Sequence, residues 1–152
     1  MAVPVESDLD FGGTSKITGL PAPTSASDAV TKSYADGLGG GVAFVSFTIP
    51  GAASVGVGSA RWYTTISRAV SNVTISGGVA PTGASLIADV NKNGTTVFTT
   101  QGNRPTLTAA SYYDGSSTPD VTTMSPGDYL TVDIDQVGST VPGSDIVVTV
   151  YF

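Results

Sequence analysis

Residues 84–104 read Ala-Ser-Leu-Ile-Ala-Asp-Val-Asn-Lys-Asn-Gly-Thr-Thr-Val-Phe-Thr-Thr-Gln-Gly-Asn-Arg, and this stretch decides the fold class. Leu86, Ala88 and Val90 fall at every second position, the period of a strand with one face on a core. Asn93-Gly94 then supplies two residues that tolerate positive φ, and residues 95–100 are mostly β-branched. The stretch therefore predicts a β-hairpin.

The same pattern recurs from residue 41 to the C-terminus. Leu130, Val132 and Ile134 alternate with polar residues and are expected to face inward. Further strands are expected at 43–49, 61–67, 72–76, 106–112, 121–124, 129–135 and 145–152, with a loop over 114–119. About eight strands in roughly 110 residues, with no helix between them, predict a mainly β domain, an antiparallel β-sandwich or jelly roll.

Residues 1–40 depart from this pattern and predict a separate extension. Met1 to Asp10 has no hydrophobic period and is interpreted as an extended arm, followed by a very short strand and a turn. Ser25 is typical of an N-cap, so a helix is expected over about 26–36, ended by Gly37. Gly39-Gly40-Gly41 is expected to be a hinge. The predicted domains are therefore 1–40 and 41–152.

The predicted helix is too short to be stable alone. Val30 and Tyr34 lie on one narrow apolar stripe of an 11-residue segment, and helix nucleation is costly. The stripe must dock either on the β domain or on the same helix of neighbouring subunits. The flexible hinge favours the second alternative.

Composition excludes several function classes. The chain has a net charge of −6 and six basic residues, which are scattered singly, so no nucleic-acid surface is expected. No apolar run approaches the ~18–20 residues of a membrane-spanning helix. The N-terminus lacks the basic region of a signal peptide, so synthesis in a host cytoplasm is expected. Without cysteine the chain has no disulfide or thiolate chemistry, and without histidine it lacks the commonest general base and the usual zinc ligand.

Two acidic patterns are candidates for chemistry. Asp89-x-Asn91-x-Asn93-Gly94 matches the first half of a calcium loop, but Thr100 stands where a bidentate Glu is required, so a hairpin turn is favoured. Asp133 and Asp135 lie ~7 Å apart on one strand face, a separation that suits a glycosidase pair, although a solvated face is commoner. We therefore predict no catalytic, cofactor-binding or metal-binding residues.

Aromatic residues offer a third pattern. Trp62-Tyr63, Tyr112-Tyr113 and Tyr129 are candidates for a sugar-stacking surface, although core or interface roles are favoured. Trp62, Tyr112 and Tyr113 are kept as candidate glycan contacts. The last strand is apolar on both faces, which predicts a central, covered strand. Its terminal Phe152 is expected in a subunit interface or, with equal weight, in an ordinary core.

Two stretches resemble bacteriophage structural proteins. Residues 8–37, with Lys-Ile-Thr-Gly-Leu-Pro-Ala-Pro at 16–23 and Asp-Ala-Val-Thr-Lys-Ser-Tyr-Ala-Asp at 28–36, resemble a segment of phage fibre proteins. Gly19 replaces the Asn that is frequent there, and the segment occurs once instead of several times. Residues 85–152 resemble a C-terminal β domain of phage virion proteins, with Gly-Asp-Tyr-Leu-Thr-Val-Asp at 127–133 among its marks. The resemblance implies a homotrimer with the short helix near the three-fold axis.

The resemblance and the chain's length predict a function at the virion surface. The favoured function is a capsid decoration (cement or head-fibre) protein with the major capsid protein as partner, and the alternative is a short tail fibre or a receptor- or glycan-binding tip. An enzymatic role is not expected. The predicted capsid-anchoring residues are Val3, Val5, Leu9 and Phe11, and the predicted trimer-interface residues are Ile17, Leu20, Val30, Tyr34 and Phe152.

Overall fold

The structure, a computed structural model, describes Thr24 and residues 44–152. The chain divides into two units, residues 1–41 and 42–152, and the fold described below is that of the second. The predicted arm, the predicted short strand and the predicted helix lie outside the described residues.

The described residues form a mainly β fold with several antiparallel sheets and no barrel, as the sequence predicts. The strands are β1 (Phe44–Ala52), β2 (Gly56–Val57), β3 (Trp62–Tyr63), β4 (Arg68–Ala69), β5 (Asn72–Val79), β6 (Leu86–Lys92), β7 (Thr95–Thr96), β8 (Thr106–Leu107), β9 (Tyr113–Ser117), β10 (Thr123–Met124), β11 (Tyr129–Gln136) and β12 (Ser144–Tyr151). One 3₁₀ turn, η1 (Gln101–Asn103), lies between β7 and β8.

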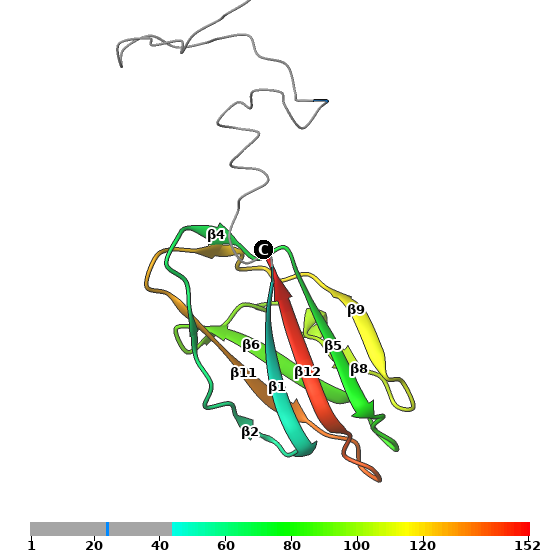
Figure 1. The fold of residues 1–152 in the computed structure, drawn as a ribbon. Helices are drawn as coiled ribbons and strands as arrows, with labels where there is room; N and C mark the ends of the chain where they lie inside the picture. Colours follow the sequence, from blue (N-terminus) through cyan, green and yellow to red (C-terminus); the bar gives the residue numbers. More distant parts are fainter. Residues whose placement is uncertain (1–23, 25–43) are drawn as a thin grey trace, which may run out of the picture. The chain divides into compact units, whose positions relative to one another are not determined.

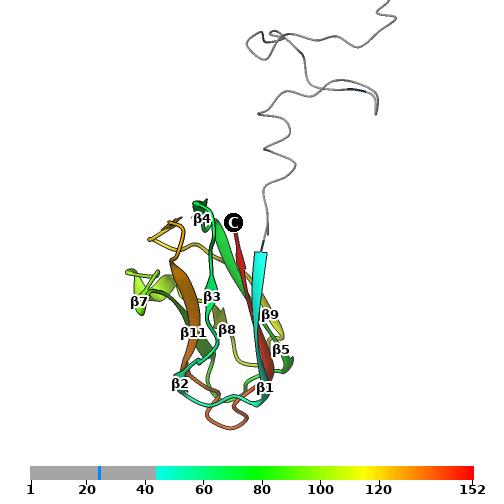
Figure 2. The ribbon, with the colours of Figure 1, turned by 60° about the vertical axis from the view of Figure 1, so that its left-hand side comes forward.

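Two sheets account for most of these strands. Sheet A has the order β1-β12-β5-β9, and sheet B has the order β2-β11-β6-β7. The short strands β2 and β3 both pair with β11, while β7 and β8 both pair with β6, so each edge of sheet B is one interrupted strand. The strands β10 and β4 form a separate pair. Figures 1 and 2 show sheets A and B as two facing layers.

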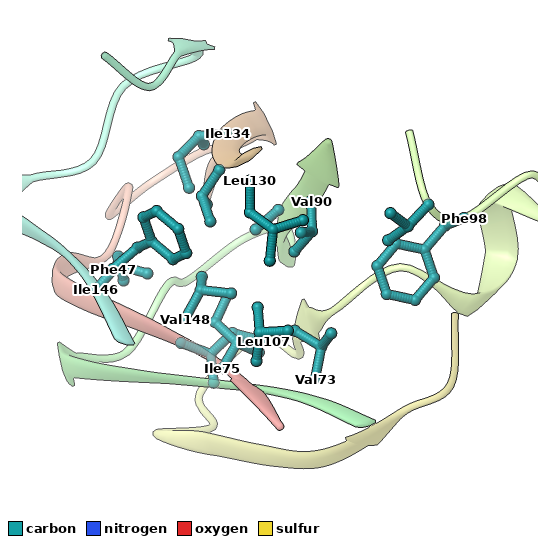
Figure 3. Close-up of a cluster of buried hydrophobic side chains, with 14 of the residues drawn as sticks. Phe47, Val73, Ile75, Val90, Phe98, Leu107, Leu130, Ile134, Ile146 and Val148 are labelled. Carbon is teal, nitrogen blue, oxygen red and sulfur yellow. The ribbon is translucent and has the colours of Figure 1, made fainter. Parts of the chain in front are cut away.

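One hydrophobic core joins the two sheets. Sheet A contributes Val73, Ile75, Ile146, Val148 and Val150, and sheet B contributes Leu86, Ala88, Val90, Leu130, Val132 and Ile134, all of which are buried. Figure 3 shows Ile75 and Val148 of sheet A facing Val90 and Leu130 of sheet B, with Phe47 of β1 also in the core. Burial of this apolar surface is the main favourable term in folding, at about 25 cal/mol per Å².

The predicted hairpin is confirmed. Asn93 and Gly94 have φ values of 52° and 83°, and Lys92 pairs with Thr95 across the turn. The return strand is shorter than predicted, because it leaves the ladder after Thr96. Its next two residues, Val97 and Phe98, are buried in the core instead.

Strand boundaries in the loops were predicted less well. The expected strand at 61–67 is only β3, and that at 106–112 is only β8. The predicted loop at 114–119 is wrong, because β9 occupies residues 113–117 and pairs with β5. Its sequence, Tyr-Asp-Gly-Ser-Ser, has little strand propensity. Backbone pairing with the long neighbouring strand β5 therefore outweighs the low strand propensity of residues 113–117.

The prediction for the last strand is confirmed as to its position. The strand β12 lies between β1 and β5, so it is central in sheet A. Ile146, Val148 and Val150 on its inner face are buried, and Val147 on the other face is half-buried.

Candidate functional site

The predicted anchoring and interface residues of the extension lie outside the described residues. They are Val3, Val5, Leu9, Phe11, Ile17, Leu20, Val30 and Tyr34. Candidate surfaces within the described part of the chain are therefore those of the β domain alone.

The outer face of sheet A carries almost no charge. We call this surface face A and define it by Phe44, Ser46, Thr48, Asn72, Thr74, Ser76, Tyr113, Val147, Thr149 and Tyr151. The rings of Phe44 and Tyr151 lie 6.0 Å apart, and the hydroxyls of Ser46 and Thr149 are 2.8 Å apart. Asp145 lies at its margin, where the carboxylate accepts the N–H of Gly51. Face A is therefore a surface of hydroxyl and aromatic groups.

The outer face of sheet B is acidic. We call it face B and define it by Asp89, Asn91, Thr96, Arg104, Thr131, Asp133 and Asp135. Asp89 lies directly opposite Asp133 on the neighbouring strand. Asn91 Nδ2 donates to Asp133 Oδ2 at 2.8 Å, Thr96 donates to Asp89 at 2.8 Å, and Arg104 pairs with Asp135. The acids are thus held by neighbouring polar side chains.

Burial distinguishes the central acid of face B. Asp89 is only 7% exposed. Its burial raises the pKa of its carboxyl above the ordinary value, which the hydrogen bond from Thr96 partly offsets, and the charge of Asp135 adds to the increase. Thr131, predicted to face outward, lies on this outer face but is also only 7% exposed.

The residues of the half calcium motif serve the hairpin and its neighbours. Asn93 donates to Asp128 Oδ1 at 2.7 Å and accepts the N–H of Tyr129 at 3.0 Å, so it joins the 93–94 turn to the 125–128 turn. Asp128 also accepts the N–H of Ser125 and pairs with Lys92. These contacts, with Ser125 first, lower the pKa of Asp128. Among the described residues, no cluster of three or more acidic residues is arranged to hold a metal ion.

The candidate aromatic residues fall in three separate places. Trp62 stacks on Phe152 with ring centroids 5.1 Å apart, and the guanidinium of Arg68 lies 5.1 Å from the Phe152 ring. Phe152, predicted either in a subunit interface or in an ordinary core, is thus half-buried against its own domain. Tyr63 and Tyr129 form a second pair, 5.4 Å apart.

Tyr112 and Tyr113 form the third place, and the structure does not bring them together with Trp62. Both are exposed at the edge of sheet A that carries β9, whereas Trp62 lies on the edge of sheet B that carries β2 and β3. An apolar groove lies between β1 and β2. Because β1 and β9 are the two edges of sheet A, the β2 edge of sheet B lies on the opposite side of the domain from β9. The aromatic residues therefore do not form one sugar-stacking surface.

The sequence reasoning missed one further feature, a polar hollow between η1, β8 and β9. Its volume is about 490 Å³, and its lining includes Asn103, Arg104, Thr106, Thr108, Asp114 and Ser116. Four of its nine lining residues belong to the segment predicted as a loop, and the pairing of β9 with β5 positions them. Nothing in the local sequence predicts that pairing.

Comparison of the chain with protein-family models and with curated proteins finds no match. In the part of the chain that the structure describes, there is no helix of the length and hydropathy needed to span a bilayer.

Proposed function

We propose that the protein is a structural protein of the bacteriophage virion surface, a homotrimer with a jelly-roll β-sandwich that decorates the capsid. The extension of residues 1–40 binds the major capsid protein, and the β domain stands outward as a knob. The resemblance of residues 8–37 and 85–152 to phage virion proteins supports this proposal.

The observation that carries the proposal is the strand order. When each interrupted edge of sheet B counts as one strand and the small β10-β4 pair is set aside, eight strands remain. Numbered along the chain, sheet A then has the order 1-8-3-6, and sheet B has the order 2-7-4-5. This order supports the proposed jelly roll, an eight-stranded architecture of two Greek keys that is used in viral capsid domains.

Face A supports the assembly part of the proposal. Copies of a chain with a net charge of −6 repel one another, and this repulsion is smallest where the surfaces that meet carry no charge. Depletion of charge together with exposed Phe and Tyr is typical of the centre of a protein interface. We therefore place the contact between protomers on face A, through Phe44, Thr149 and Tyr151.

An experiment on particles tests the anchoring role. Particles genetically lacking the protein are mixed with the full chain or with a variant lacking Met1 to Asp10. The full chain is expected to bind and the truncated chain to remain free, while light scattering gives both the mass of a trimer. Binding of the truncated chain would show that the arm is not the anchor, and a monomeric mass for the full chain would contradict the assembly.

The second candidate function is a short tail fibre or receptor-binding tip. It is favoured by the exposed Tyr63 and its half-buried neighbour Tyr129, where the Arg61 guanidinium lies 4.7 Å from the Tyr129 ring. Exposed aromatic and Arg side chains are common anchors for partners. Inhibition of host-cell adsorption by the purified protein, lost in Tyr63→Ala, would favour this function over decoration.

A further inference from the structure

Hydrogen bonds and strand pairing support both walls of the polar hollow. On one wall, Gln101 donates to the carbonyl of Phe98 at 2.6 Å, and the carboxylate of Asp120 accepts the N–H of Thr100 at 2.7 Å. Arg104 is held by the carbonyl of Gln101 and by Asp135. On the other wall, β9 pairs with β5, and Figure 1 shows β8 and β9 next to each other at this edge of the domain. The backbone of both walls and the side chain of Arg104 are therefore held in place by contacts within the domain.

Several of these polar groups have no partner in the protein. Within the described part of the chain, the side chains of Asn103, Thr108, Asp114 and Ser116 take part in no hydrogen bond. Together they present one carboxylate, one amide and two hydroxyls toward the same space. The hollow thus offers both donors and acceptors to an incoming molecule.

The charge and size of the hollow select the chemistry of its ligand. Its single cation, Arg104, is already paired with Asp135, which disfavours an anionic ligand. A single carboxylate, Asp114, is too few for a calcium site, which takes six to eight oxygen ligands. The lining is polar, which disfavours an apolar ligand, and about 490 Å³ lies within the usual range of small-molecule sites. A neutral molecule with several hydroxyls satisfies all of these conditions.

We propose that this hollow binds a neutral hexopyranose unit of a carbohydrate. The Asp114 carboxylate accepts two neighbouring sugar hydroxyls, while Asn103 supplies an amide donor and acceptor. Thr108 and Ser116 complete the set from β8 and β9. No aromatic ring lines the hollow, so the affinity rests on hydrogen bonds and a single site binds weakly. This site is independent of the proposed capsid role, and its lining includes none of the aromatic candidates, although Tyr113 directly precedes Asp114 on β9.

Solution NMR of the full chain locates the binding. The protein is titrated with glucose, galactose, mannose, N-acetylglucosamine and their common disaccharides. At least one sugar is expected to shift backbone amide signals at 102–108 and 114–118, with little change elsewhere. If no sugar of this panel shifts these amides, or if the shifts centre on Tyr63 and Tyr129, the proposal is overturned.

Matched variants then test the named side chains. Asp114→Asn removes the charged acceptor with little change of shape, and is expected to weaken binding about tenfold or more. Asp145→Asn makes the same change outside the hollow and is expected to bind as the native chain does. Unchanged binding by Asp114→Asn would overturn the proposal.

A blocking variant provides a test that does not depend on hydrogen bonding. Gly102 lines the hollow, and a Cβ atom at this position would meet no atom within 4 Å, so Gly102→Leu adds bulk without disturbing the fold. It is expected to abolish the sugar-dependent shifts while its own spectrum stays native-like. Native affinity in Gly102→Leu would place the sugar elsewhere and overturn the proposal.

Discussion

Face A and face B cover the two sides of one core, yet their chemistry is opposite. Face A presents hydroxyl, aliphatic and aromatic side chains, whereas face B presents three acids with the cation, the amide and the hydroxyl that hold them. Both sheets obey the same alternation and bury comparable rows of Val, Ile and Leu. Because the core depends on the inward residues, the outward residues can differ between the two sheets. Those of face A suit contact with another protein, and those of face B suit contact with water.

The largest expected effect tests the role of face A. Thr149→Glu places a charge at the centre of the surface where we propose that protomers meet, and burying an unpaired charge is costly. We expect the trimer to dissociate completely in light scattering while circular dichroism stays native-like. Thr95→Glu, the same change on β7 opposite Lys92, is the control and should remain trimeric. A trimeric Thr149→Glu would remove face A from the interface.

The next effect compares the edges of the two sheets. A Cβ atom at Gly58 would lie 2.0 Å from the backbone oxygen of Val132, so Gly58→Ala must push the β2–β3 edge away from β11. We expect a loss of about 3 kcal/mol in the free energy of unfolding, measured by urea denaturation. At the β9 edge of sheet A, Gly115→Ala would meet only the ring of Tyr113, which is 62% exposed and can move. Its cost should stay below about 1 kcal/mol, and equal costs would contradict this reading of the two edges.

A smaller effect concerns Asp128, which joins the 125–128 turn to the 93–94 turn through its hydrogen bond with Asn93. Hydrogen bonds lower the pKa of Asp128 in the folded state. Its carboxylate therefore stabilises the folded state fully above the ordinary carboxyl pKa of about 3.9. That contribution is lost as the pH falls through the lowered folded value. Asp128→Ala should therefore lower the Tm at pH 7, and the difference from the native chain should vanish in acid. A difference in Tm that persists at the lowest pH would mean that the contribution of Asp128 to stability does not depend on its charge.

The smallest expected effect is an increase in stability, and it comes from removing the charge of Asp89. The pKa of Asp89 is raised in the folded state, so this residue costs stability as the pH rises from about 3.9 through the raised value. Asp89→Asn keeps an acceptor for Thr96, and it removes the buried charge and its repulsion from Asp135. It should gain about 0.5–1 kcal/mol at pH 7 by thermal denaturation, and the gain should fade toward pH 4. Asp89→Ala, which loses the Thr96 bond, should not show this gain, and a loss of stability in Asp89→Asn would show that the acid is well accommodated.

The prediction from sequence succeeded where a single segment contained all the information. The Asn93-Gly94 turn and the inward row of Leu130, Val132 and Ile134 follow from local backbone preference and a period of two. It failed at β9, whose Asp-Gly-Ser-Ser composition indicates a loop. It also treated Trp62 and Tyr113 as candidates for one site, although their strands lie at opposite edges of different sheets.

The sequence by itself determined that this protein is mainly β, where its hairpin turns and which residues of its regular strands enter the core. Alternation and turn chemistry act within a few residues of each other, so they can be read along the chain. Only the tertiary structure decided that Phe152 stacks on Trp62, that Asp89 faces Asp133 and that η1, β8 and β9 enclose a polar hollow. Each of these depends on pairing between strands far apart in sequence, and such pairing is chosen by the fit of the whole core.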